Sequence, residues 1–307
     1  MTGLLVIGAN GQVGWDVNRQ ACAAGLSCLA LSRAQLDITN RDLVFRTVEQ
    51  VRPTCVVNAA AYTAVDKAED DAETAYAVNR DGAKSLAAAC AAVGASLIHI
   101  STDYVFDGEK SAPYKEDDAV APLGVYGASK LAGEEAVRGH CSEHIILRTS
   151  WVYGRHGHNF VRTMLRLGRE RDSLRVVDDQ FGSPTFAGDL SAAILKLVSD
   201  LRCGAWPDGG FGTFHCAGHG ITTWCEFARA IFRRAPSPPV IEAIGTVEYP
   251  TPAKRPRNSA LDCTKLAHVH GIVLRPWETA LEAILDDLTK PPASRETSKP
   301  FKERASQ

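Results

Sequence analysis

Tyr126 and Lys130 are four residues apart in the segment YGASK, and this spacing places both side chains on one face of a helix. A tyrosine hydroxyl ordinarily titrates at about pH 10, and a neighbouring ammonium group stabilises the phenolate and lowers that pKa. The phenol could then exchange a proton at neutral pH. Taken alone, the spacing is equally compatible with an exposed helical turn.

Three glycines, Gly8, Gly11 and Gly14, follow an apolar run in the segment GANGQVG. The first permits a tight turn, the second lets a pyrophosphate approach the backbone, and the third lets the next helix pack closely on the strand. Free N–H groups and the positive end of the helix dipole would then face the phosphates. The GxxGxxG spacing, typical of short-chain dehydrogenases, predicts a dinucleotide site; the alternative is a turn without a ligand.

The end of the second predicted strand bears on the choice of cofactor. An acid there would bond the ribose 2′-hydroxyl of NAD and repel a 2′-phosphate. This chain instead has Ser32 and Arg33, a hydroxyl beside a guanidinium, which suits a phosphate. We therefore expect NADPH to be used at least as well as NADH, with a solvent-facing arginine as the alternative. Asp37 and Ile38 could flank the adenine ring.

Two further strand ends carry suitable residues. Thr102 follows an apolar run, and hydroxyls at the carboxyl end of a parallel strand lie where such sheets bind ligands. Thr102 could therefore hydrogen-bond the carbonyl oxygen of a substrate. Small residues after residue 58 leave room for a cofactor. The order of glycine turn, strand-end hydroxyl and YxxxK predicts hydride transfer.

These groups require a parallel sheet to position them. Short apolar runs alternate with helical stretches through the first half, a pattern that predicts parallel βαβ units. The expected strands are 4–8, 27–31, 55–58, 96–101 and 145–150. The expected helices are 13–24, 40–51, 68–93 and 126–140. We therefore predict an α/β fold, with a doubly wound Rossmann sheet over residues 1–150 to which part of the later chain returns.

Residues 151–288 are more irregular and predict a smaller lobe that mainly binds substrate. Residues 250–257 have proline at three positions and cannot form a regular helix. Helices are expected at 159–169, 189–200, 224–233 and 276–288, and 178–185 is expected to be a loop with strand character. The charged run 169–175 is expected to be a solvated surface. The polar residues 289–307 predict a disordered tail.

Composition argues against several other classes of protein. Lys and Arg number 34 and Asp and Glu 36, a balance that disfavours binding to nucleic acid or to an anionic membrane. No apolar stretch is long enough to span a membrane, and no signal peptide is evident. The nine cysteines lack CxxC spacing, which predicts reduced thiols and a cytoplasmic protein.

Seven segments occur in this order: GANGQVGWDV, VNAAAYTAVDKAE, STDYVFDG, YGASKLAGE, LRTSWVYG, DDQFGSPT and RPRNSALD. Over roughly residues 1–288 the sequence resembles the dTDP-4-dehydrorhamnose reductase family of extended short-chain dehydrogenases. The resemblance implies that NADPH or NADH reduces the 4-keto group of dTDP-4-dehydro-L-rhamnose to give dTDP-L-rhamnose.

The resemblance also implies roles for individual residues. Tyr126 matches the general acid, Lys130 its partner, and Thr102 with Asp103 the pair that contacts substrate. Trp151 matches an aromatic residue that packs on the sugar, although without the resemblance a core position would be favoured. The expected cofactor contacts are Gly8, Asn10, Gly11, Gln12, Val13, Ser32, Arg33, Asp37, Ile38, Ala60, Ala61, Tyr62, Thr63, Tyr126 and Lys130.

Four polar residues of the second half are candidate donors to a nucleotide diphosphate: Asn159, Gln180, Arg255 and Asn258. A guanidinium matches phosphate geometry best, so Arg255 is the strongest of them. A structural capping role is the alternative for each.

Other features limit what the resemblance implies. Some members of the family form a dimer through Mg²⁺ held by acids; Asp16 could still bind the ion, but Gly188 stands where a second acid is expected. The prediction therefore includes no metal and leaves a monomer and a homodimer open. His215 and His219 lack an evident third metal ligand. Two alternative functions remain: reduction of another nucleotide 4-keto-6-deoxysugar, and a non-catalytic regulatory subunit on the same fold.

Overall fold

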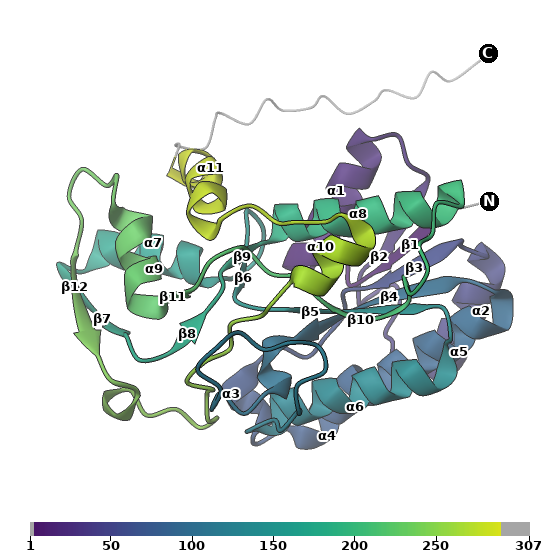
Figure 1. Cartoon of the computed structure of the whole chain (residues 1–307), viewed down its shortest axis with the longest axis horizontal. Coiled ribbons are helices and arrows are strands. Elements are labelled where there is room, and N and C mark those ends of the chain that lie inside the picture. The colour runs from purple at the N-terminus through teal and green to yellow at the C-terminus, as the bar shows by residue number, and fades with distance from the viewer. Residues whose placement is uncertain (1–2, 290–307) are drawn as a thin grey trace, which may run out of the picture.

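A parallel sheet of six strands organises the computed structural model, which describes residues 3–289 (Figure 1). The strand order is β10-β5-β4-β3-β1-β2, and every neighbouring pair is parallel. The strands are β1 (Leu4–Ile7), β2 (Cys28–Leu31), β3 (Cys55–Asn58), β4 (Ser96–Thr102), β5 (His144–Thr149) and β10 (Gly212–His215). Five of the six lie where the sequence predicts strands.

Helices cover both faces of this sheet because successive side chains of a strand point to opposite sides. On one face, Val6, Val57 and Ile98 pack with residues of α1, α8 and α10. On the other, Leu5, Val56 and Leu97 pack with α2, α5 and α6. These helices are α1 (Gln12–Ala23), α2 (Arg41–Val51), α5 (Ala83–Val93), α6 (Val125–His140), α8 (Ala187–Cys203) and α10 (Thr264–His270).

The chain reverses direction across the sheet between β1 and β3. From β1 it passes to β2 on one side and then returns to β3 on the other. The loops after β1 and β3 therefore diverge at their carboxyl ends, and open α/β sheets bind ligands in the crevice at such a point. The glycine-rich turn follows β1, and the small residues 59–61 follow β3.

The predicted helix 68–93 is divided in the structure. It comprises α3 (Val65–Ala68), α4 (Ala72–Tyr76), a π-helical segment η1 (Ala77–Gly82) and α5. Asn79 in the π-helical segment is buried, accepts a hydrogen bond from the Tyr62 backbone N–H (2.9 Å) and donates to Ser129 of α6 (2.9 Å). A π-helical segment often marks a functional position within a helix. Here it joins the loop after β3 to α6.

The second lobe has its own apolar core, in which Tyr153, Phe227 and Trp277 are buried. Its main elements are α7 (Phe160–Glu170), β7 (Ser173–Val177), α9 (Trp224–Phe232), β12 (Val240–Ile244) and α11 (Trp277–Thr289). The remaining short elements are η2 (Asp103–Val105), β6 (Val152–Tyr153), β8 (Phe181–Gly182), β9 (Thr185–Phe186), β11 (Thr222–Thr223) and η3 (Thr246–Glu248). This lobe lies beside the carboxyl edge of the main sheet (Figure 1).

One expectation for the second half is wrong in detail, and one is confirmed. The charged run 169–175 is not only a solvated surface, because Ser173 begins β7, which pairs in parallel with β12. Leu174 and Val176 of β7 are buried, whereas its charged Arg175 is exposed. The strand character expected at 178–185 is divided between β8 and β9.

None of the helices within residues 3–289 is long and apolar enough to cross a membrane. The predicted tail lies outside the described residues from position 290 onward, while Thr289 ends α11.

Candidate active site

Two adjoining cavities follow the carboxyl edge of the sheet. One of them measures about 360 Å³ and is lined by residues after β1, β2 and β3, including Gly8, Arg33 and Ala60. We call it the adenosine cavity, after the group that the sequence predicts to bind there. The central cavity, about 580 Å³, contains Thr102, Tyr126, Lys130 and Trp151. Both are lined by Asn10, Gly11, Ala59, Ala61 and Thr63. Together they form one trough across the point where the sheet reverses.

The glycine turn has the geometry that a pyrophosphate requires. Gly8 has φ +84°, and a Cβ there would lie 2.6 Å from the Ala60 nitrogen. A Cβ on Gly14 would lie 2.3 Å from the Gly8 carbonyl oxygen. Gly11 caps α1 without a side-chain hydrogen bond, and the first turn has no acid. The first N–H groups of a helix lack partners within it, so this end of α1 fits an anionic dinucleotide.

The residues after β2 that the sequence predicts to contact the cofactor lie at the surface. Arg33 has 76% of its side chain exposed, and its Nε lies 3.2 Å from Asp37 Oδ2. Both residues line the adenosine cavity, as does Ile38. Ser32 lines neither cavity, because its hydroxyl donates to Gln35 Oε1 (2.8 Å). The ion pair uses only the Nε of Arg33, and the same carboxylate would repel a phosphate bound beside it.

Tyr126 lies in the first turn of α6, which is held close to the end of β4. The Val125 backbone N–H donates to Glu69 Oε1 (2.9 Å), fixing the start of the helix. A Cβ on Gly127 would lie 2.2 Å from the Tyr104 carbonyl oxygen, so glycine permits this approach. The Tyr126 and Tyr104 rings meet edge to face at 5.8 Å.

Lys130 is almost completely buried one turn further along α6. Its Nζ donates to the Ile100 carbonyl oxygen (2.6 Å) and lies 3.4 Å from His99 Nε2. Burial lowers the pKa of Lys130 to about 8, and the Glu134 carboxylate opposes this shift. The sequence predicts that this ammonium lowers the pKa of Tyr126. In the unliganded protein, burial instead raises the pKa of Tyr126 to about 12.

Thr102 and Asp103 lie at the end of β4, as the sequence indicates. The Thr102 hydroxyl donates to Asp103 Oδ1 (3.0 Å) and hydrogen-bonds the Tyr126 phenol, an interaction that opposes the rise in the phenol pKa. Asp103 is buried, and burial raises its pKa to about 7. These three residues therefore form one hydrogen-bonded chain of groups that can carry protons.

Trp151 forms the wall of the central cavity opposite the sheet. Its ring stacks on that of Trp224 at 3.5 Å with an interplanar angle of 6°. Trp151 has φ +46°, an uncommon backbone conformation for a bulky residue that often occurs at functional sites. A Cβ on Gly182 would lie 2.4 Å from the indole, so glycine makes room for it. The pair presents an aromatic surface on which a sugar ring can pack.

A third cavity, called here the outer cavity, adjoins the central one at Trp224 and measures about 630 Å³. Its walls include Gln180, Arg255, Tyr249, Arg171 and Phe160. Arg255 binds Asp66 of α3 through two nitrogens, at 3.0 and 2.7 Å. This predicted phosphate ligand therefore also connects the two lobes.

Asn159 and Asn258 occupy structural positions instead of lining these cavities. The Asn159 amide caps α7 by accepting from the Arg162 N–H (3.1 Å), and it donates to Gln12 and to the Gly154 carbonyl oxygen. Asn258 donates to the carbonyl oxygens of residues 110 and 112 and accepts from the N–H of residue 260. Both donor hydrogens of each amide are used, so the structural alternative is favoured for these two residues.

The acids that could hold Mg²⁺ do not form a metal site. Asp16 is ion-paired with Arg19 (2.9 Å), and Asp189 accepts two hydrogen bonds from Arg275 (2.6 and 3.0 Å). Residues 3–289 contain no cluster of three or more His, Cys, Asp or Glu arranged to hold an ion.

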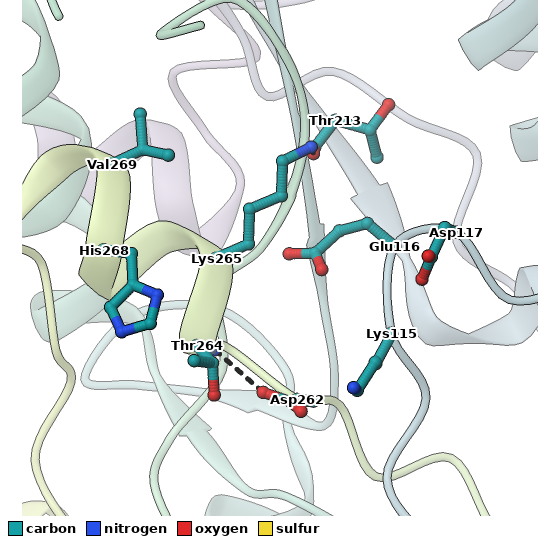
Figure 2. Close-up of a pocket in the computed structure, with 9 residues that line it drawn as sticks. All are labelled: Lys115, Glu116, Asp117, Thr213, Asp262, Thr264, Lys265, His268 and Val269. Carbon is teal, nitrogen blue, oxygen red and sulfur yellow. Dashed lines mark hydrogen bonds between the residues drawn. The ribbon is translucent and has the colours of Figure 1, made fainter.

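Figure 2 shows a larger cavity, about 850 Å³, between α10 and the loop 115–117. Its side chains have mixed charges, and several hold the fold together. Lys265 Nζ donates to the Thr213 carbonyl oxygen (2.8 Å), and Glu116 accepts from the His215 N–H (2.8 Å). None of the sequence-predicted site residues lines it. Size alone therefore does not identify the active site.

The sequence does not single out Trp224 and Tyr249, which line these cavities. Nor does it single out Asn58 and His99, which lie buried next to each other beneath Lys130. Trp224 and Tyr249 come from segments whose packing no local spacing reveals. An available signal for His99 is an imidazole within the apolar strand LIHIS, which is unusual for a buried strand.

Comparison with known proteins agrees with this geometry. Residues 1–290 match the family model described as the RmlD substrate binding domain. A dTDP-4-dehydrorhamnose reductase from Aggregatibacter actinomycetemcomitans is 43% identical over 92% of this chain and 98% of its own. A crystal structure of the Clostridium acetobutylicum reductase has a TM-score of 0.88 at 40% identity, covering 94% of this chain and 100% of its own.

The Bacillus anthracis dTDP-4-dehydrorhamnose reductase, solved in complex with NADP, has a TM-score of 0.87 at 38% identity. This alignment covers 94% of this chain and 100% of that one. The glycine turn, the tyrosine–lysine pair and these matches lead to one conclusion: the chain belongs to the dTDP-4-dehydrorhamnose reductase family.

Proposed function

We propose that this protein reduces the 4-keto group of dTDP-4-dehydro-L-rhamnose to a hydroxyl, giving dTDP-L-rhamnose, with NADPH or NADH as the reductant. The observation that carries the proposal is the central cavity. Thr102, Tyr126, Lys130 and Trp151 all line it, and it continues into a trough floored by the glycine turn. Relatives about 40% identical over most of the chain carry this activity as their name.

The dinucleotide, when bound, supplies a hydride to the keto carbon. Negative charge develops on the keto oxygen as the hydride arrives, and the protein must neutralise it. We assign the proton to the Tyr126 phenol as general acid. The Thr102 hydroxyl, once turned from Asp103 to the substrate, is a second donor that orients the oxygen. Lys130 supplies donors to the ribose hydroxyls and stabilises the phenolate that remains.

The pKa values of the unliganded protein support this division of roles. Burial raises the pKa of Tyr126 to about 12, so the phenol carries its proton at neutral pH and can give it to the substrate. Burial lowers the pKa of Lys130 to about 8, so the ammonium form predominates below that pH. The value of kcat/KM, which reports the free protein, should therefore decline as the pH rises through about 8.

We assign the nucleotide diphosphate to the outer cavity. The exposed Tyr249 ring offers a surface for a pyrimidine base, and Arg171 and Arg255 offer positive charge for the phosphates. Gln180, whose amide donates to Thr246 Oγ1 (3.0 Å), has one amide hydrogen left for a ligand. The cavity meets the central one at Trp224, as a sugar linked to a diphosphate requires.

A reducing compartment suits this function. All nine cysteines lie in the described part of the chain and are free, which supports our placement of the protein in the cytoplasm. A monomer and a homodimer are both compatible with the site, because every residue assigned above comes from one chain.

The test follows hydride transfer directly. Purified protein is mixed with NADPH deuterated at the transferable position and with dTDP-4-dehydro-L-rhamnose, and the product is analysed by NMR. We expect oxidation of NADPH and deuterium at C4 of dTDP-L-rhamnose. Turnover only with a 4-keto-6-deoxysugar of another configuration would replace the substrate assignment. Tight dinucleotide binding without turnover of any such sugar would support a non-catalytic subunit.

A further inference from the structure

A buried hydrogen-bonded chain lies beneath the proposed catalytic lysine. It consists of Asn58 at the end of β3, His99 in β4 and Lys130 in α6, whose side chains are each no more than 2% exposed. Nothing in the mechanism above uses His99. An imidazole enclosed beneath a catalytic amine can alter how readily that amine takes up a proton.

The direction of the first hydrogen bond is fixed by the backbone. The Ala60 N–H can only donate, and it points at the Asn58 side chain at 3.1 Å, so the atom facing it is the amide oxygen. The amide nitrogen of Asn58 then lies 3.0 Å from His99 Nδ1. Since that nitrogen can only donate, Nδ1 must accept.

This assignment determines the tautomer of His99. A neutral imidazole has one donor and one acceptor nitrogen, so with Nδ1 accepting, the proton lies on Nε2. Burial lowers the pKa of His99 well below its usual value, and Lys130 lowers it further, so the ring stays neutral. Nε2 faces Lys130 Nζ at 3.4 Å. A hydrogen bond can form there only when the lysine is an uncharged amine that presents its lone pair.

We propose that the Asn58–His99 pair is a positioning device that favours the neutral amine form of Lys130 in the free protein, so that binding of the dinucleotide increases the charge on this nitrogen. Asn58 orients the His99 ring with Nε2–H toward the lysine, and Nε2–H favours the form without a charge. Ribose hydroxyls that accept from Nζ would favour the ammonium. Cofactor binding and proton uptake are thereby linked at this nitrogen. This inference rests on the proposed function only in naming the dinucleotide.

The charged and titratable groups around the pair set the pH range over which Lys130 gains or loses its proton. Glu134, one turn after Lys130, favours the ammonium; it is buried and held by Arg148 through two nitrogens at 2.9 and 2.8 Å. His144 of β5 faces His99 and disfavours a charge on its ring. Tyr126, one turn before Lys130, carries a neutral phenol. These opposing effects fit a pKa of about 8 for Lys130, between that of a free lysine and that of an isolated buried amine.

The first test needs neither substrate nor cofactor. Nitrogen-15 NMR of the histidine-labelled free protein at pH 7 reports which ring nitrogen of His99 carries the proton. The proposal requires the proton on Nε2, and His99→Gln identifies the signal. A proton on Nδ1 would overturn the proposal, whatever the enzymatic activity turns out to be.

The second test measures proton uptake when NADPH binds to the free protein. Titration calorimetry at pH 8 in buffers of different ionisation enthalpy should show uptake of about half a proton per site, since a group with a pKa of about 8 is half protonated there. His99→Gln, whose amide oxygen can accept from the ammonium, should lose most of this uptake, because Lys130 would already be charged in the free protein. Equal uptake in the wild type and the variant would contradict the proposal.

Asn58→Asp should reverse the tautomer of the His99 ring. A carboxylate keeps an acceptor for the Ala60 N–H and adds one that faces Nδ1, so the proton should move to Nδ1. Nε2 would then accept from the ammonium, and the alkaline limit of activity should shift upward by at least about one pH unit. A folded variant with the proton still on Nε2 would show that Asn58 does not set the tautomer.

Discussion

The half of this site that we propose binds the cofactor and the half that we propose binds the substrate, called here the cofactor half and the substrate half, use different kinds of backbone. Residues of the cofactor half follow strands of one sheet by a few positions, as Gly8 follows β1 and Ala60 follows β3. Residues of the substrate half come from loops and short elements far apart in the chain, and Trp151 meets Trp224 across 73 positions. Geometry in the first half is fixed by the sheet, whereas in the second it depends on pairwise packing.

This difference teaches where a single change should do most harm. The sheet and α1 leave no room to adjust, since a Cβ at Gly14 would meet backbone. In the substrate half the equivalent contacts are side chains, which can move. We therefore expect substitutions in the glycine turn to abolish binding, and those around the outer cavity to weaken it by degrees.

Gly14→Ala should have the largest effect. Its methyl group would lie 2.3 Å from the Gly8 carbonyl oxygen, so the turn must shift and its N–H groups must turn away from the pyrophosphate. We expect the Kd for NADPH to rise at least about 100-fold, equivalent to about 2.7 kcal/mol, as measured by fluorescence titration.

Gly139→Ala is the matched control. A Cβ at Gly139, in the last turn of α6, meets no atom within 4 Å. This variant should keep wild-type affinity for NADPH and gain up to about 1 kcal/mol of stability. If both variants bound NADPH normally, the backbone of the cofactor half would be more adaptable than its contacts indicate.

Arg255→Ala tests the adaptable half, where the guanidinium both lines the outer cavity and binds Asp66. Loss of a charge-assisted hydrogen bond of about 1.5–3 kcal/mol should raise the KM for the nucleotide sugar about 10- to 100-fold. The kcat should change by no more than a few-fold. Steady-state kinetics with varied sugar nucleotide gives both constants.

Asp66→Ala separates the two roles of Arg255. It breaks the same ion pair but keeps the guanidinium, so its effect on KM should be much smaller. Equal effects of the two substitutions would mean that Arg255 only joins the lobes and does not bind phosphate.

Asp103→Asn tests the junction of the two halves. Burial raises the folded-state pKa of Asp103 from 3.8 to about 7, so the folded protein binds a proton that the unfolded chain has released. The free energy of unfolding therefore falls as the pH rises from about 4 to about 7. Asparagine removes this loss and should stabilise the protein at pH 8 by up to about 4 kcal/mol, with little difference near pH 3.

Urea unfolding at several pH values measures this effect. Asp107→Asn serves as the control of opposite sign, because the hydrogen bond from Tyr114 lowers the pKa of Asp107. Its stabilising contribution is present at neutral pH and lost in acid. If Asp103→Asn destabilised the protein at pH 8, the carboxylate would be charged and well solvated in the folded state.

Arg33→Ala should have the smallest effect, since most of that side chain is exposed and its ion pair with Asp37 competes with a ligand. The Kd for NADPH should rise about 3- to 10-fold, while the Kd for NADH should be unchanged. Titration with both dinucleotides checks the difference. A parallel change for both would remove Arg33 from recognition of the 2′-phosphate.

The sequence predicts the rigid half well because its chemistry follows local order. Apolar runs locate the strands, and most of the residues predicted to contact the cofactor lie in the loops that follow them. Tyr126 and Lys130 share a helix, where spacing alone determines their relative placement. Ser32 is the exception, because its hydroxyl finds a nearer partner in Gln35.

The rest depends on tertiary contacts that no local pattern reveals. The parallel pairing of β7 with β12 joins a short strand that follows charged residues to one that follows a proline-rich connection, so neither stands out in the sequence. Asn159 and Asn258 have suitable donors for phosphate, but nearby backbone groups use those donors. His99 could be noticed as a polar residue in an apolar strand, yet its tautomer depends on a residue 41 positions away.

The central claim is that the Tyr126 phenol gives the proton that accompanies hydride transfer. The most direct test is a single-turnover measurement of NADPH oxidation by Tyr126→Phe with saturating dTDP-4-dehydro-L-rhamnose. General acid catalysis contributes about 10²–10⁴-fold, so the rate should fall by that factor while the Kd for NADPH stays within a few-fold of the wild type. A rate within a few-fold of the wild type would contradict the account.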